Sequence, residues 1–220
     1  MASRVRPVSG STRSSNSEMA LSSLLSFGLV LGVLSRTRWG PLLEPYGAAP
    51  AAPAVVRQAA LIYAAVSGVH AYVLWVLNRF LREAYEFHGA DRAVLLAVAL
   101  LGVDVVADVA LTLSGAPGFQ VYPIPLGFFG LILSYPHFAY FALGVAMIAL
   151  GYSLLRAPEN AYGLLRPYGQ AQIVAGAALA APPLAGLWPW PAAVGHVLLG
   201  LIFFQASTRQ AGAVTRRMDR

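Results

Sequence analysis

The stretch of sequence that decides the fold is residues 93–113, which read AVLLAVALLGVDVVADVALTL. Almost every residue in it is apolar, and an α-helix of this length extends about 30 Å. Because this matches the hydrocarbon thickness of a bilayer, the stretch predicts a transmembrane helix. Asp104 and Asp108 lie one helical turn apart on the same face of that helix. Ionisable groups at membrane depth are costly and usually functional, so the two aspartates are the first candidate site residues.

The composition of the whole chain agrees with a membrane protein. Of the 220 residues, 58% are hydrophobic and 11% are charged, and the mean hydropathy is +0.64. A soluble domain carries about 25% charged residues, so this chain has too little charge to cover a water-exposed surface. All 15 basic residues are arginine, and the chain contains no cysteine. This excludes a Schiff-base lysine, a thiolate nucleophile, a disulfide and a cysteine-ligated metal.

Runs of apolar residues predict an all-α, polytopic membrane helix bundle of about six transmembrane helices. The six predicted spans are residues 19–34, 55–77, 93–113, 128–155, 171–187 and 191–205. The second span is expected to continue as a more polar helix through residue 87. The first span is short and Pro182–Pro183 interrupts the fifth, so these two are also compatible with re-entrant or interfacial segments.

The arginines predict the orientation of this bundle. They concentrate in residues 1–18, between spans two and three, between spans four and five, and after residue 208. The positive-inside rule therefore predicts that both termini are cytoplasmic, with Arg36, Arg38 and Arg57 as exceptions. We expect a disordered basic flank (1–18), a transmembrane domain (19–208) and a basic cytoplasmic tail (209–220). The protein is predicted to be multi-pass, in the endoplasmic reticulum of a eukaryote or the plasma membrane of a prokaryote.

Helical depth, counted from the predicted span ends, suggests which polar residues meet. Asp104 and His137 are expected at one level, and Asp108 and His196 at a level nearer the outer face, with His70 deeper than both. A carboxylate–imidazole pair satisfies both groups and can hold or pass a proton near neutral pH. The sequence therefore predicts a buried cluster of Asp104, Asp108 and His137, with His70 and His196 as further members.

Tyrosines on two spans extend this predicted cluster. Tyr135 precedes Pro136 in the fourth span, where a proline removes one helical hydrogen bond, and Tyr140 follows one turn later. Tyr63 lies on the same face of the second span as Ser67 and His70, at spacings of four and seven residues. These side chains predict a polar cavity between helices, which is a common position for a ligand in a bundle.

The predicted function is acid–base chemistry on a lipid-soluble small molecule, of an isomerase, dehydratase or cyclase type. Asp104 or Asp108 would be the general acid or base, and His137 and Tyr135 would position it. His70, Tyr63, Tyr140 and His196 would line the binding site. Whether the protein is an enzyme stays open, because the sequence contains no complete catalytic motif.

Three alternatives remain at this stage. One is a non-catalytic assembly subunit, in which polar side chains hold transmembrane helices together. The second is a b-type haem protein, which requires two histidines at equal depth on facing helices. The third is a proton-coupled carrier. No metal site and no resident cofactor other than that haem are expected. The expected partners are membrane lipid and a lipid-soluble small molecule, with a homo- or hetero-oligomer possible and no nucleic acid, because the arginines flank apolar spans.

Overall fold

The computed structural model describes residues 17–31, 53–113, 137–157 and 163–218, and every regular element in these ranges is helical. The elements are the α-helices Ser17–Leu31, α2 (Pro53–Tyr85), α3 (Asp91–Leu113), α5 (His137–Leu155), α6 (Leu165–Ala180) and α7 (Pro189–Met218), and the 3₁₀-helix η1 (Pro182–Leu187). The predicted all-α fold class is therefore confirmed for the described ranges.

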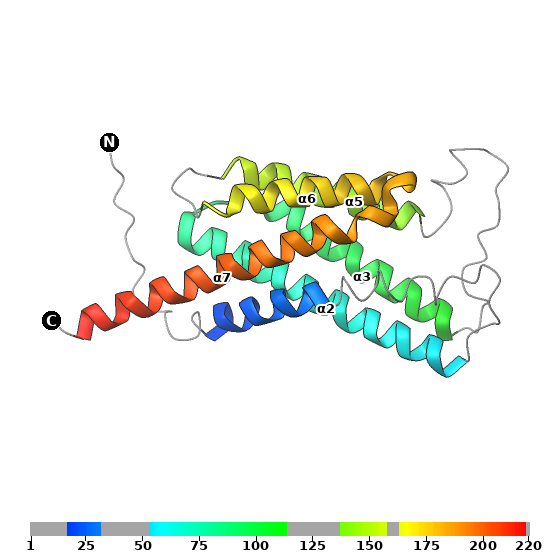
Figure 1. Ribbon diagram of the computed structural model, residues 1–220, viewed down its shortest axis with the longest axis horizontal. Helices are drawn as coiled ribbons and strands as arrows, with labels where there is room; N and C mark the ends of the chain where they lie inside the picture. The colour runs from blue at the N-terminus through cyan, green and yellow to red at the C-terminus, as the bar shows by residue number, and fades with distance from the viewer. Residues whose placement is uncertain (1–16, 32–52, 114–136, 158–162, 219–220) are drawn as a thin grey trace.

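Successive helices lie side by side along the long axis of the molecule and run in alternating directions (Figure 1). α2 packs against α3, α3 against α5, α5 against α6, and α6 against α7. Two polar contacts attach the Ser17–Leu31 helix. Ser23 Oγ donates to the Gly200 carbonyl of α7 at 2.9 Å, and Glu18 forms an ion pair with Arg79 of α2 at 3.1 Å.

A tight turn reverses the chain between α2 and α3. Glu86 adopts a left-handed backbone conformation (φ 51°), and the amide of Phe87 donates to the Leu81 carbonyl at 3.1 Å. A backbone hydrogen bond that reaches back into the end of the helix is typical of a helix that ends at a residue with left-handed backbone conformation. α3 then begins at Asp91, whose carboxylate suits the positive end of the helix dipole. The short turn makes α2 and α3 antiparallel neighbours.

The α5–α6 contact depends on glycines. A Cβ atom on Gly144 would lie 2.6 Å from the carbonyl oxygen of Gly176, and one on Gly151 would lie 2.4 Å from that of Gly169. Each helix thus presents two glycines, seven residues apart, to the backbone of the other. Small residues allow this close approach, and they are enriched where transmembrane helices pack.

The Ser17–Leu31 helix buries serines together with Met19 and Leu29, while several of its other leucines are exposed. Ser22, Ser23 and Ser26 are buried against the bundle, while Leu24 is 70% exposed and Leu31 is 72% exposed. Large apolar side chains are exposed on α2, α3 and α7 as well, and the buried polar residues Ser67, Asn78 and His196 belong to α2 and α7. In water such exposure would be unfavourable, whereas in lipid it is expected.

Two described helical segments are long and apolar enough to cross a membrane, Leu61–Tyr85 in α2 and Pro189–Thr208 in α7. Ser17–Leu31 and Ala139–Leu155 are shorter apolar helices. α6 begins six residues before the predicted fifth span and ends before the two prolines, which η1 contains. α7 continues to Met218, well beyond the predicted end of the sixth span at residue 205.

Candidate functional site

One face of α2 carries the polar side chains that organise the candidate site. Tyr63, Ser67 and His70 recur at helical spacing, as the sequence predicted, and Ser67 is only 4% exposed. The remaining residues of this part of α2 are mainly apolar, and several of the largest, such as Leu61 and Ile62, point away from the bundle. The polar face of α2 is therefore turned toward its neighbouring helices.

His70 meets His196 of α7. The centroids of the two imidazole rings are 4.8 Å apart and the ring planes are inclined by 77°, an edge-to-face contact. His196 is 3% exposed, and its Nδ1 atom has no hydrogen-bond partner within the described parts of the chain. Each imidazole can both donate and accept a hydrogen bond, and the two rings touch edge to face without a described hydrogen bond between them.

The other end of the same face reaches α3. The Tyr63 hydroxyl donates a hydrogen bond to Oδ2 of Asp104. The phenol donor satisfies a carboxyl group that would otherwise be costly inside an apolar helix pair. Seven residues separate Tyr63 from His70, so the two contacts lie about 10 Å apart along α2. We use the name α2 polar face for Tyr63, Ser67 and His70 of α2 together with their partners, Asp104 of α3 and His196 of α7.

The structure brings together some predicted site residues and does not test others. Asp104 is hydrogen-bonded to Tyr63, and the ring of His70 contacts the ring of His196. Neither of these two pairs was predicted from the sequence. The side chains of Asp108 and His137, and all of Tyr135, lie outside the described residues. Their membership of the cluster stays a prediction.

One expectation about depth was wrong. His70 was expected to lie deeper than His196, but the ring contact places them at the same level. Counting from span ends assumes that all helices begin at the same height. The start of α2 lies farther along the long axis of the bundle than the start of α7 (Figure 1). Equal numbers of residues from the two helix starts therefore do not correspond to equal depths.

Tyr140 lies on α5. This half-buried side chain of α5 packs against an apolar cluster contributed by α5, α6 and α7, which includes Met147, Leu179 and Ala192. Tyr140 therefore packs where α5, α6 and α7 meet.

Gln172 of α6 is a buried polar residue that was not among the predicted site residues. It is 2% exposed, and its Nε2 atom is 3.2 Å from the position that a Cβ atom on Gly195 would occupy. Gly195 directly precedes His196, so the amide of Gln172 lies against the turn of α7 that carries the histidine. The sequence signals for this contact were a glutamine, Gln172, within an Ala- and Gly-rich helix, and a glycine, Gly195, beside a histidine.

Comparison with protein-family models, with curated proteins and with solved structures finds no match.

The donor set of the site bears on metal and haem binding. Among the described residues, no group of three or more His, Cys, Asp or Glu side chains is placed to hold a metal ion. A b-type haem would have to lie between its two axial imidazoles. The direct edge contact of His70 with His196 leaves no space for a porphyrin between these two rings as they lie here.

Proposed function

We propose that the chain is a multi-pass membrane protein whose six helices cross or enter the bilayer, with both termini cytoplasmic. The buried serines and exposed leucines of the Ser17–Leu31 helix support this proposal, as do the glycine contacts between α5 and α6. The arginines near the end of α2 and the start of α3 support the orientation.

The topology can be tested directly because the chain contains no cysteine. Gly163 and Gly186 precede and follow α6, and a side chain added at either would meet no atom within 4 Å. We expect Gly163→Cys to react with a membrane-impermeant maleimide only from the cytoplasmic side, and Gly186→Cys only from the opposite side. Labelling of both cysteines from the same side would contradict the proposal that α6 spans the membrane.

We further propose that the α2 polar face performs acid–base chemistry on a lipid-soluble small molecule. The observation that carries this proposal is the contact of His70 with His196 on the same helix face as the Tyr63–Asp104 hydrogen bond. The Asp104 carboxyl group would give a proton to the substrate or take one from it, with Tyr63 holding it in place. The two imidazoles would supply or receive the balancing proton. Asp108, His137 and Tyr135 are proposed as further members.

The experiment compares membrane lipids of cells that express the wild-type chain, Asp104→Asn or no protein, by mass spectrometry. We expect a lipid-soluble species whose amount changes with the wild-type protein and returns to the background level with Asp104→Asn. General acid–base catalysis contributes about 10²–10⁴-fold to a rate, so the loss should be nearly complete. Asp91→Asn is the matched control, because Asp91 lies in the α2–α3 turn beside His88. Identical lipid profiles for wild type and Asp104→Asn, with both proteins in the membrane, would overturn the proposal.

A proton-coupled carrier is the second candidate function. The same two contacts favour it, because the Tyr63–Asp104 hydrogen bond and the His70–His196 ring contact place ionisable groups at two levels along α2. In reconstituted vesicles a carrier would dissipate an imposed pH gradient when its solute is present, whereas an enzyme of the first type would leave the gradient unchanged.

A further inference from the structure

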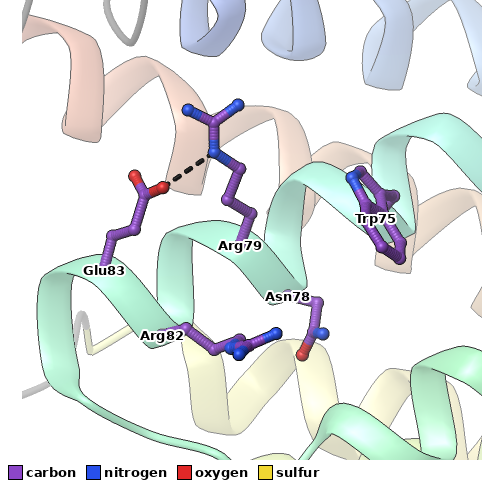
Figure 2. Close-up of a pocket in the computed structure, with 5 residues that line it drawn as sticks. All are labelled: Trp75, Asn78, Arg79, Arg82 and Glu83. Carbon is purple, nitrogen blue, oxygen red and sulfur yellow. Dashed lines mark hydrogen bonds and ion pairs between the residues drawn. The ribbon is translucent and has the colours of Figure 1, made fainter. Parts of the chain in front are cut away.

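Beyond His70, toward the end of α2, a second group of polar residues lines a pocket with a volume of about 310 Å³ (Figure 2). Its described lining residues are Trp75, Asn78, Arg79, Arg82 and Glu83. These recur at helical spacing and so share one face of α2. None of them belongs to the α2 polar face, and the proposed acid–base chemistry does not use them.

Two carboxylates already balance the first arginine of this pocket. Arg79 Nε donates to Glu83 Oε1 at 2.8 Å, the contact drawn as a dashed line in Figure 2, and Arg79 Nη1 lies 3.1 Å from Glu18 Oε2. The ion pair with Glu18 holds α2 to the Ser17–Leu31 helix, whereas the contact with Glu83 lies within α2. These two interactions also mean that Arg79 contributes little positive charge for an additional anion.

The second arginine is less fully paired. The carboxylate nearest to Arg82 is that of Asp91, whose Oδ2 atom is 4.0 Å from Arg82 Nε and 3.3 Å from His88 Nδ1. The side chain of Arg82 is 52% exposed and extends along α2 toward Asn78 (Figure 2). A guanidinium with free N–H groups is well suited to bind a phosphate through two parallel hydrogen bonds.

Asn78 supplies an independent sign of a ligand. Its side chain is only 7% exposed, yet Oδ1 has no hydrogen-bond partner within the described residues. A buried amide without a partner is unfavourable, and rotation of the amide exchanges its acceptor and its donor. An ammonium group entering the pocket would satisfy the acceptor.

Trp75 gives the pocket an apolar wall. Its indole is 56% exposed, and it precedes the arginines by one to two turns on the side toward the membrane-depth part of α2. Tryptophans at this position are enriched where the hydrocarbon region meets the headgroups. Along α2 the side chains that line the pocket therefore change from aromatic to charged. A lipid that lies along the pocket changes from acyl chain to headgroup in the same direction.

We propose that this pocket binds the headgroup of a phosphatidylethanolamine-type lipid from the cytoplasmic leaflet. Arg82 contacts the phosphodiester, Asn78 contacts the primary ammonium group, and Trp75 contacts the glycerol and the first acyl carbons. The charges favour a zwitterion, because Arg79 and Arg82 are matched by Glu18, Glu83 and Asp91 and leave no positive excess for an anionic lipid. The inference rests on the proposed topology and does not depend on the acid–base chemistry.

The test exposes the full, delipidated chain to equimolar phosphatidylethanolamine, phosphatidylglycerol and phosphatidylcholine with identical acyl chains. Native mass spectrometry then measures the lipid retained. We expect phosphatidylethanolamine to be retained preferentially, and Arg82→Gln to lower its retention about tenfold through loss of charge-assisted hydrogen bonds. Glu83→Gln should move the preference toward phosphatidylglycerol, because it frees the charge of Arg79. Arg92→Gln, outside the pocket, is the matched control and should bind as wild type.

Several outcomes would overturn the inference. These are equal retention of the three lipids, preference of the wild type for phosphatidylglycerol, and unchanged retention by an Arg82→Gln protein that elutes and melts as wild type does. Release of the lipid by millimolar inorganic phosphate would indicate a free-phosphate site instead. Arg82→Lys, which keeps the charge, guards against misfolding and should retain part of the binding. Retention by Asp104→Asn separates this inference from the proposed chemistry, and cysteine labelling reports the topology independently.

Discussion

Gly176→Leu is expected to prevent α5 and α6 from packing and to abolish the folded bundle. A Cβ atom at this position would lie 2.5 Å from the carbonyl oxygen of Gly144 and 3.0 Å from the side chain of Ile148. The nearer atom belongs to the backbone and cannot move without separating the helices. Overpacking by a single methyl group costs about 1–3 kcal/mol, so Gly176→Ala should already be destabilising and leucine should exceed what the bundle tolerates.

The measurement is thermal unfolding and size-exclusion elution of the purified protein in detergent. Gly102→Leu is the matched control, because a side chain added to Gly102 on α3 would meet no atom within 4 Å. We expect this control to melt close to wild type, whereas Gly176→Leu should aggregate or elute as an expanded species. If both variants behaved alike, the close α5–α6 contact would not be a determinant of stability.

The elements whose ends have clear local signals were predicted well from the sequence. Residues 93–113 are almost uniformly apolar and follow a charged turn, and α3 spans Asp91–Leu113. The fifth span was predicted to begin at residue 171, six residues after the start of α6 at Leu165. The polar side chains of Arg166, Gln170 and Gln172 lower the hydropathy of this part of the helix. Its true start at Leu165 follows from packing against α5 through Gly169 and Gly176, a contact between distant segments that hydropathy does not report.

For the candidate site too, local features were predicted from the sequence, whereas contacts between helices were not. The spacing of Tyr63, Ser67 and His70 correctly identified one face of α2, because helical periodicity is a local property. The partners of that face depend on how far each helix is displaced along its neighbours. The glycine contacts of α5 with α6, and of α6 with α7 at Gly195, fix that displacement. The contact of His196 with His70 therefore required the assembled bundle.

The double substitution His70→Leu/His196→Leu is expected to separate function from stability. Replacing both partners of a buried polar contact by apolar groups of similar size is often neutral or stabilising, because no polar atom is left without a partner. His196 Nδ1 already lacks a described partner, so little hydrogen bonding is lost. We expect the double variant to melt at or above the wild-type temperature. The proposed acid–base activity, measured as the lipid-soluble species that depends on Asp104, should fall by about 100-fold or more.

A contact that serves only to hold helices together should behave in the opposite way, and Ser23→Ala is the matched control for it. Ser23 Oγ donates to the Gly200 carbonyl, and loss of such an interhelical hydrogen bond costs about 0.6–2 kcal/mol. We therefore expect Ser23→Ala to lower the melting temperature and to keep its activity per folded molecule. If the histidine double variant also lost stability, and its activity fell only in proportion to the folded fraction, the imidazole pair would be a packing contact. The α2 polar face would then lose its second proton-exchanging group, and the acid–base proposal would depend on Asp104 alone.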